Sequence, residues 1–121
     1  MANFEVFKTD NNGGTFSIIK NDIDGTFPCG GETMTGRIFC FYIAYNESTK
    51  KYDLKMVYSD NQGTDWSDPA DIIADIDEAQ LGWRESETGQ IFISYWKNDK
   101  PYIIYTDDRG ENWSTPIEVK E

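Results

Sequence analysis

The sequence contains no histidine, and only two of its 121 residues are cysteines, Cys29 and Cys40. Without histidine the chain has neither a Ser-His nor a Cys-His pair for nucleophilic catalysis, and it lacks a typical zinc site. The cysteines leave two interpretations open. A disulfide between them is geometrically possible, but Cys40 lies in an apolar run and fits equally well as a small buried side chain. We predict no metal and no other cofactor.

Basic residues and long apolar runs are also scarce. The chain has 11 Lys and Arg against 22 Asp and Glu, which gives a net charge of −11. Such a chain repels phosphate, so we expect no nucleic-acid partner and no membrane partner. No apolar run approaches the length of a membrane span, and the first residues show no signal-peptide core. We therefore expect a cytoplasmic protein with reduced thiols.

Aromatic residues are abundant, at 15 %, and Gly, Asn, Asp and Ser recur in short clusters. This composition is typical of short strands joined by tight turns. At 121 residues the chain has the length of one domain with a modest core. The prediction is a single all-β domain over residues 1–121.

One segment of the chain occurs three times. The stretch Tyr58–Pro69 recurs 47 residues later as Tyr105–Pro116, and a looser copy, Thr9–Ser17, lies 50 residues before it. The copies share one template: Ser or Thr, any residue, Asp or Asn, any residue, Gly, two residues and an aromatic. The template residues are Thr9, Asn11, Gly13 and Phe16; Ser59, Asn61, Gly63 and Trp66; and Thr106, Asp108, Gly110 and Trp113.

The template has the chemistry of a turn. The Asp or Asn side chain accepts hydrogen bonds from backbone N–H groups further along, and the hydroxyl does so more weakly. Glycine permits a positive φ, and the aromatic ring pins the hairpin to its neighbours. The oxygens of Asp108, Asn61 and Asn11 also suit calcium, but the spacing lacks the oxygen-rich loop that calcium needs. Strand-like runs flank two copies: Leu54–Tyr58, Pro69–Ile73, Tyr102–Tyr105 and Pro116–Val119.

The repeat extends beyond the turns. Gly36–Tyr42 corresponds to Gly89–Tyr95 at an offset of 53, and the loop at Asn46–Lys51 explains why the offset then falls to 47. Both segments are apolar on both faces, which predicts strands buried on both sides. With a first strand near Glu32–Thr35 or Leu81–Glu85, each unit has four strands.

Four antiparallel strands in about 50 residues make one propeller blade. We predict blades at about 30–75 and 79–120, and a half-blade at about 3–22 that supplies the last two strands of a blade. The open ends of such a stack would expose apolar side chains, among them Phe39, Phe41, Ile91 and Ile93. We therefore expect a homo-oligomer, or a partner chain that completes the propeller.

The three copies resemble the Asp-box, the bacterial neuraminidase repeat of sialidase-like β-propellers. The Thr106–Trp113 copy matches at every defined position, the second copy has Asn61 in place of Asp, and the first has Asn11 and Phe16. The resemblance covers nearly the whole chain. It implies antiparallel four-stranded blades, about two and a half of them in this sialidase-like partial β-propeller, and a structural role for the repeats on the rim.

The resemblance does not extend to catalysis. Sialidases clamp the substrate carboxylate with three arginines and use a Tyr–Glu pair and an acidic Asp. This chain has three arginines in all, and of these only Arg84 falls on a strand expected to line the axis, whereas Arg37 and Arg109 do not. We therefore predict that the chain is not an enzyme.

One cluster suggests recognition. Trp83, Arg84 and Glu85 on an axial strand, extended by Trp96, could stack on and hydrogen-bond a sugar or a peptide. The alternative is that Trp83 packs between blades while Arg84 and Glu85 are solvated. The hypothesis is a non-catalytic binding or assembly module that presents a surface to a glycan or protein partner. The alternatives are a structural accessory subunit of a large assembly, such as a virus particle, and a glycan-active hydrolase with a site formed between subunits.

Overall fold

The computed structural model describes residues 3–120 as an all-β protein, as the sequence predicts. Three antiparallel sheets, of two, four and four strands, hold all the strands in this part of the chain. The strands are β1 (Asn3–Lys8), β2 (Ser17–Asp24), β3 (Thr26–Glu32), β4 (Ile38–Asn46), β5 (Lys51–Ser59), β6 (Ala70–Ile76), β7 (Gly82–Glu85), β8 (Ile91–Lys97), β9 (Lys100–Thr106) and β10 (Ile117–Glu118).

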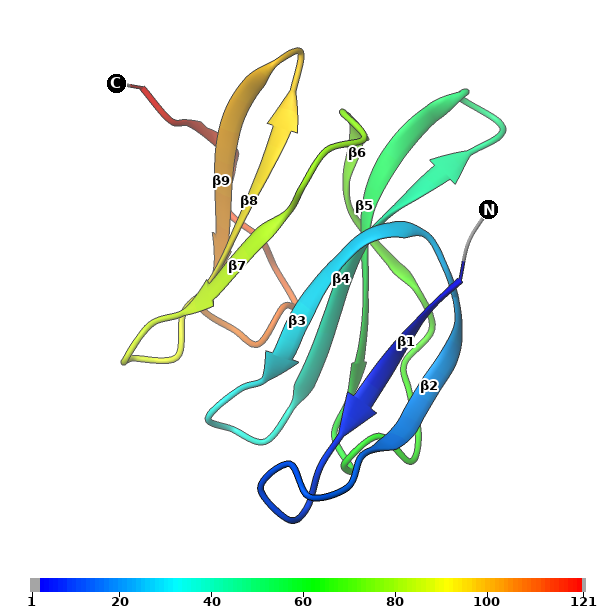
Figure 1. Ribbon diagram of the computed structural model, residues 1–121. Coiled ribbons are helices and arrows are strands. Elements are labelled where there is room, and N and C mark those ends of the chain that lie inside the picture. Colours follow the sequence, from blue (N-terminus) through cyan, green and yellow to red (C-terminus); the bar gives the residue numbers. More distant parts are fainter. Residues whose placement is uncertain (1–2, 121) are drawn as a thin grey trace.

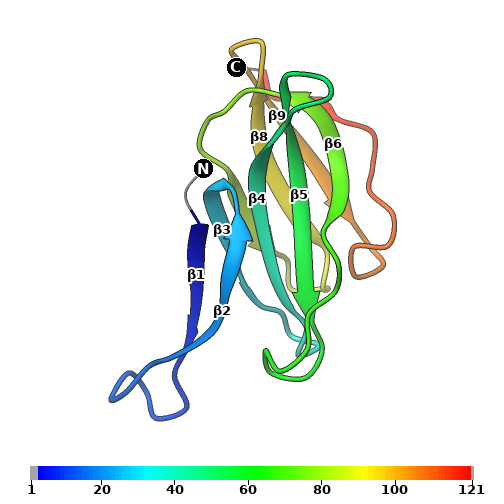
Figure 2. The ribbon, with the colours of Figure 1, turned by 90° about the vertical axis from the view of Figure 1, so that its right-hand side faces the viewer.

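Within each sheet the strands follow one another in chain order (Figure 1). We call the sheets the N-terminal sheet (β1–β2), the middle sheet (β3–β6) and the C-terminal sheet (β7–β10). They lie side by side as three layers with the middle sheet between the other two (Figure 2). The predicted strands that flank the second and third repeats overlap β5, β6, β9 and β10, although Pro69, Pro116 and Val119 lie outside the observed strands.

The first strand of the middle sheet differs from its predicted position near Glu32–Thr35. β3 ends at Glu32, and residues 33–36 form a tight turn in which the Gly36 N–H donates to the Thr33 carbonyl at 2.9 Å. β3 contains Pro28, Gly30 and Gly31, and both residue types are rare in strands, so the sequence does not predict a strand here. The structure accommodates them with a register shift opposite β4.

The larger core lies between the middle and C-terminal sheets. Phe39 and Phe41 of β4 meet Ile91 and Ile93 of β8, and each is at most 2 % exposed. The expectation that these four side chains would be exposed is wrong, because each sheet covers the other. β4 is buried on both faces as predicted, whereas β8 is buried on only one face, since Ser94 and its other outward side chains have no sheet over them among the described residues.

A smaller core joins the N-terminal sheet to the opposite face of the middle sheet. The ring of Phe4 lies 5.5 Å from that of Tyr42, and Ile23 packs with Cys40. The hairpin therefore lies against the first three strands of the middle sheet, β3, β4 and β5. Gly25 alone connects β2 to β3, and a Cβ there would lie 2.6 Å from the Tyr42 ring.

The two cysteines are free thiols. Cys29 packs against the core shared with the C-terminal sheet, whereas Cys40 belongs to the core shared with the N-terminal sheet. Burial raises the pKa of Cys29 to about 11 and that of Cys40 to about 12. Both thiols are therefore protonated at neutral pH, and as buried thiols they pack as small apolar side chains.

The glycines of the tight turns provide the first test. Gly110 has a φ of 87°, and a Cβ there would lie 3.1 Å from the Phe39 ring, whereas Gly36 has a φ of 89° and open space around it. Gly110→Val should lower the free energy of unfolding by more than about 1 kcal/mol, through backbone strain and overpacking. Gly36→Val, the control, meets the strain alone and should cost less. Equal losses in urea titrations would contradict the packing contribution.

Candidate functional site

The three repeat turns share one hydrogen-bond network. In the third turn the Thr106 hydroxyl donates to Asp108 Oδ1 at 2.7 Å and accepts from the Gly110 N–H at 3.1 Å. Asp108 Oδ1 also accepts from the Asn112 N–H at 3.0 Å. The same bonds join the equivalent atoms of the other turns: Gly13 to Thr9 at 2.9 Å, Thr15 to Asn11 at 2.8 Å, Gly63 to Ser59 at 2.9 Å and Asp65 to Asn61 at 2.8 Å.

A further contact in the second and third turns was missed from the sequence. In the third turn the Asn112 amide donates to Asp108 Oδ2 at 2.8 Å, and in the second turn the Asn61 amide donates to Asp65 Oδ2 at 2.8 Å. The Asn comes first in the second turn and the Asp comes first in the third turn, but the same amide–carboxylate hydrogen bond forms in both. The sequence held the signal, because each pair is an Asn and an Asp spaced four residues apart.

These bonds leave little for a ligand. In each turn one oxygen of the Asp or Asn accepts a backbone N–H, so its lone pairs stabilise the chain itself. Over residues 3–120 no group of three or more Cys, Asp or Glu side chains lies close enough together to hold a metal ion. The turns therefore have the geometry of structural elements.

Two of the three turns pack onto the preceding sheet. Gly63 and Gly110 are buried, and a Cβ at Gly63 would lie 2.7 Å from the side chain of Ile19 on β2. The aromatic ring of each of these two turns packs on the same sheet as the turn glycine. Trp66 donates from Nε1 to the Ile19 carbonyl at 3.2 Å, and Trp113 meets the Phe41 ring edge-on with centroids 6.0 Å apart. Gly13 of the first turn is exposed.

Phe16 is the aromatic of the first turn, and it is 64 % exposed. The sequence predicts that all three aromatics are hairpin staples. Trp66 and Trp113 do pack on a neighbouring sheet, whereas Phe16 has no such sheet beneath it in the described part of the chain.

The four predicted recognition residues divide between two faces of the C-terminal sheet. Trp83 points between the sheets, where its ring centroid lies 6.4 Å from that of Phe41. Glu85 accepts the Met34 N–H at 3.0 and 3.1 Å with its two carboxylate oxygens. Both side chains therefore join the C-terminal sheet to the middle sheet.

Arg84 and Trp96 point the other way and are exposed. Arg84 is paired with Phe92, and Trp96 lies four residues further along β8, about 13 Å away at the rise of a strand. The structure thus brings Arg84 and Trp96 to one face without contact between them. It separates both from Trp83 and Glu85.

The other two arginines converge on one carboxylate. Arg37, which is 8 % exposed, donates to the two Asp60 oxygens at 2.7 and 2.9 Å, and Arg109 approaches Asp60 at 3.2 Å. The Arg37 hydrogen bonds hold the pKa of Asp60 below its usual range. The Arg37 guanidinium also lies 3.9 Å from the centre of the Tyr58 ring. Both arginines tie the middle sheet to the third turn.

The open side of the C-terminal sheet, which we call the outer face, is largely apolar. The strand register shows which side chains lie on this face, because they alternate along each strand with those that point into the core. Ile117 is 53 % exposed, Trp96 is 41 % exposed, and Phe92 and Tyr105 are half-buried with ring centroids 5.8 Å apart. Exposed apolar side chains gathered on one sheet face are typical of an association surface.

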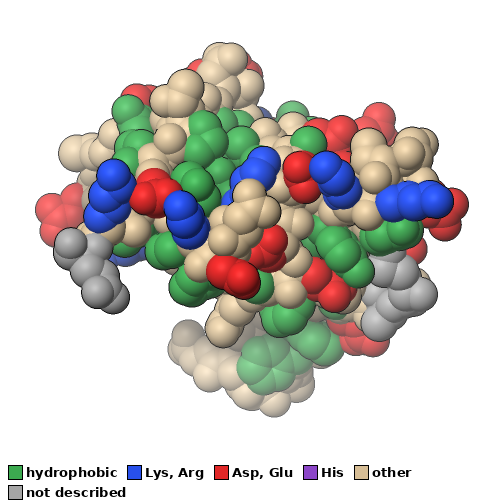
Figure 3. All heavy atoms as spheres, turned by 90° about the horizontal axis from the view of Figure 1, so that it is seen from above, with side chains coloured by type: hydrophobic (Ala, Val, Ile, Leu, Met, Phe, Trp, Pro, Cys, Tyr) green, Lys and Arg blue, Asp and Glu red, His purple; other side chains and the backbone are tan. Residues whose placement is uncertain are grey.

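Charges of both signs mark one end of the sheets. Figure 3, which views the molecule from above, shows basic and acidic side chains next to one another with hydrophobic side chains between them. The Lys51 and Lys97 ammonium groups lie 3.2 and 3.9 Å from Asp75 in that part of the fold. This end therefore presents alternating charges, unlike a surface of one sign that would attract a polyelectrolyte.

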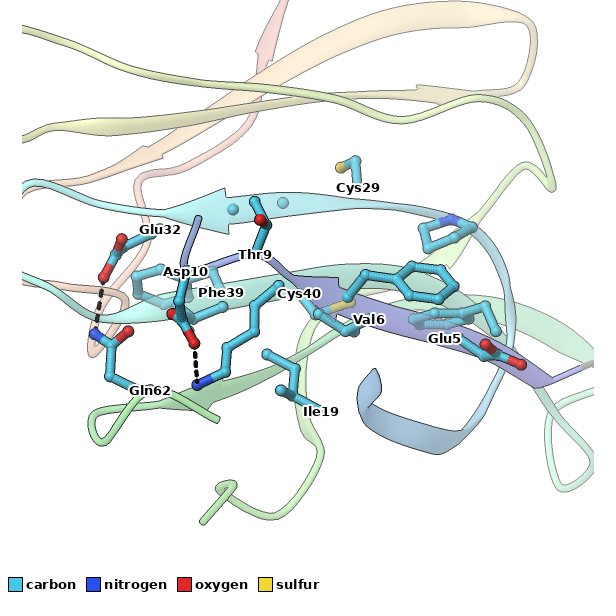
Figure 4. Close-up of a pocket in the computed structure, with 17 residues that line it drawn as sticks. Glu5, Val6, Thr9, Asp10, Ile19, Cys29, Glu32, Phe39, Cys40 and Gln62 are labelled. Carbon is cyan, nitrogen blue, oxygen red and sulfur yellow. Dashed lines mark hydrogen bonds and ion pairs between the residues drawn. The ribbon is translucent and has the colours of Figure 1, made fainter. Parts of the chain in front are cut away.

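A groove of about 400 Å³ separates β1 from β3 (Figure 4). Each of these strands pairs on one side only, within the described residues. Cys40 and Phe39 are among its lining residues, and the Gln62 amide donates to Glu32 at 3.0 Å, at the left of Figure 4. The lining combines apolar side chains and free strand edges with ionisable groups, among them Lys8 and Asp10, whose ammonium and carboxylate groups lie 3.8 Å apart.

No protein family has a model that matches the chain, and no curated protein matches it. Within residues 3–120 no helix has the length and apolar character needed to cross a membrane.

The two turn tryptophans should differ when each is replaced by phenylalanine. Trp66 Nε1 donates to two carbonyls, those of Ile19 and Gly63, at 3.2 and 3.0 Å, whereas Trp113 Nε1 is buried without a partner. Trp66→Phe should therefore cost about 1 kcal/mol more than Trp113→Phe, because only the former loses hydrogen bonds. Urea unfolding of both variants measures the difference. A larger loss for Trp113→Phe would show that this N–H is in fact satisfied.

The third turn should make stability depend on pH. Hydrogen bonds from the Asn112 side chain, the Thr106 hydroxyl and the Asn112 backbone lower the pKa of Asp108 to about 2. A folded-state pKa below the unfolded value gives stability that is present above about pH 4 and is lost as the pH falls towards 2. Asp108→Asn copies the neutral Asn61 and Asn11, so its melting temperature should fall less than that of the wild type between pH 4 and 2. Parallel curves would contradict this.

Proposed function

We propose that this chain is a non-catalytic module for binding or assembly, built as a partial sialidase-like β-propeller in which each sheet is a blade or part of one. The observation that carries the proposal is the outer face of β7–β10, which displays Trp96, Ile117, Phe92 and Tyr105 to solvent. A soluble domain seldom leaves so much of one sheet apolar unless the face is used. The partner that suits it best is a protein surface of similar apolar character.

The distribution of polar groups supports a role without catalysis. Arg37 and Arg109 are both occupied by Asp60, so they do not form a free clamp for a substrate carboxylate. Glu85 is bound to the backbone of Met34. These three residues instead hold the sheets together, so a hydrolase with a site between subunits would have to use other residues.

A glycan is the second candidate ligand, because Arg84 and Trp96 both lie on the outer face. A guanidinium and an aromatic ring are groups that recognise sugars by hydrogen bonding and stacking. A structural accessory subunit of a larger assembly, such as a virus particle, would use the same face for a protein neighbour.

The absence of catalysis is tested with fluorogenic reporters. We expect no release of fluorophore from sialyl or other glycosyl reporters above a buffer blank, at protein concentrations up to tens of micromolar. Release that Arg84→Ala abolishes and Arg109→Ala preserves would overturn the proposal. The same two variants on a glycan array separate the candidate ligands, because glycan binding lost only with Arg84→Ala would select the sugar over the protein partner.

A further inference from the structure

One kind of contact between neighbouring sheets is made twice in this chain. The second turn places Gly63 against Ile19 of the N-terminal sheet, and the third turn places Gly110 against Phe39 of the middle sheet. In both cases a glycine with a positive φ lets the turn backbone approach an apolar side chain of the preceding sheet. We call this a turn-on-face contact.

One turn in the described residues lacks such a face. Around Gly13, with its φ of 90°, the only atom within 4 Å of a Cβ is in the ring of its own neighbour Phe16, at 3.9 Å. Phe16, Phe7 and Ile18 are 64 %, 57 % and 52 % exposed. The register pairs Phe7 with Ile18, so these two side chains share the side of the hairpin that points away from the middle sheet.

One face in the described residues lacks such a turn. On the middle sheet Phe39 and Tyr58 surround the third turn, with ring centroids 6.2 Å apart. Their counterparts in the repeat are Phe92 and Tyr105 on the outer face, at 5.8 Å. The chain therefore has one free turn at one end of its stack and one free face at the other.

The polar contacts beside the third turn on the middle sheet also have counterparts on the outer face. Arg37 binds Asp60 and donates from Nη1 to the Arg109 carbonyl, just before the turn glycine, at 2.9 Å. The counterpart of Arg37 is Gln90, whose amide donates to Asp107 at 2.6 Å. A side-chain amide has two hydrogens, so Gln90 retains one for a carbonyl.

We propose that the partner of the outer face is a second copy of this chain, which inserts its first turn, Thr9–Phe16, head to tail. Gly13 and Phe16 of one copy then lie over Phe92 and Tyr105 of the next, and the Asn12 carbonyl accepts the free Gln90 hydrogen. This inference rests on the proposed function and names the partner in it. A head-to-tail contact is heterologous, so the copies form a ring if the rotation closes and a longer row if it does not.

The test uses complementary variants of the whole chain. Phe16→Gln removes the turn aromatic and keeps the face, whereas Phe92→Gln alters the face and keeps the turn. By light scattering after size exclusion at micromolar concentration, the wild type should have a multiple of the mass of one chain. Each variant alone should fall to the mass of one chain. An equimolar mixture should reach the mass of two chains, because the turn of Phe92→Gln fits the face of Phe16→Gln.

Met34→Gln is the control, since Met34 is 61 % exposed and lies outside both end surfaces, and it should assemble like the wild type. Ile103→Gln, on the same face, is a second face variant in case Phe92→Gln melts early. A wild type with the mass of one chain would overturn the inference. So would loss of assembly in one variant only, which indicates a symmetric pair, or failure of the folded variants to complement. None of these results alters the reporter assay, so the proposed function is judged separately.

Discussion

The fold depends on the need to cover both faces of β4. Phe39, Phe41 and Ile43 point to one side of this strand, and Cys40 and Tyr42 point to the other, and all five are at most 6 % exposed. Burying each large side chain contributes on the order of 2 kcal/mol before entropy is counted, so neither face can be left in water. The C-terminal sheet covers one side and the N-terminal hairpin covers the other. The layer order follows from that constraint.

The repeat turns convert this general apolar attraction into a defined packing geometry. A sheet face alone permits many sliding positions. Gly63 packs against Ile19, and Gly110 packs against Phe39 and Met56 of the preceding sheet. Arg37 adds a directed hydrogen bond to the third turn. Apolar area drives the sheets together, whereas the turns select the one arrangement in which their backbone fits.

Much of this organisation was predictable from the sequence, and the reasons are local. The turns could be found because hydroxyl, Asp or Asn, and glycine each have a distinct backbone preference at a fixed spacing. The prediction misplaced β3 because Gly30 and Gly31 have a low strand propensity. Pairing with β4 holds these residues in a strand despite that propensity. The roles of Trp83 and Arg84 depended on which face of β7 meets the middle sheet. Alternation along a four-residue strand does not reveal that.

The burial of four predicted surface residues has a related cause. Phe39, Phe41, Ile91 and Ile93 are apolar in sequence whether their sheets end a stack or meet one another. Contact between the two sheets is a property of two repeats together, and a single repeat does not contain it.

The N-terminal hairpin has a consequence for the timescale of motion. Two-stranded hairpins are marginal alone, and two register shifts interrupt the pairing of β1 with β2, so the hairpin depends on the small core around Tyr42. We therefore expect the hairpin to open more readily than the two larger sheets, with a free energy below that of global unfolding. Each opening uncovers Cys40. The rate at which a thiol reagent labels Cys40 thus reports how often the N-terminal hairpin opens.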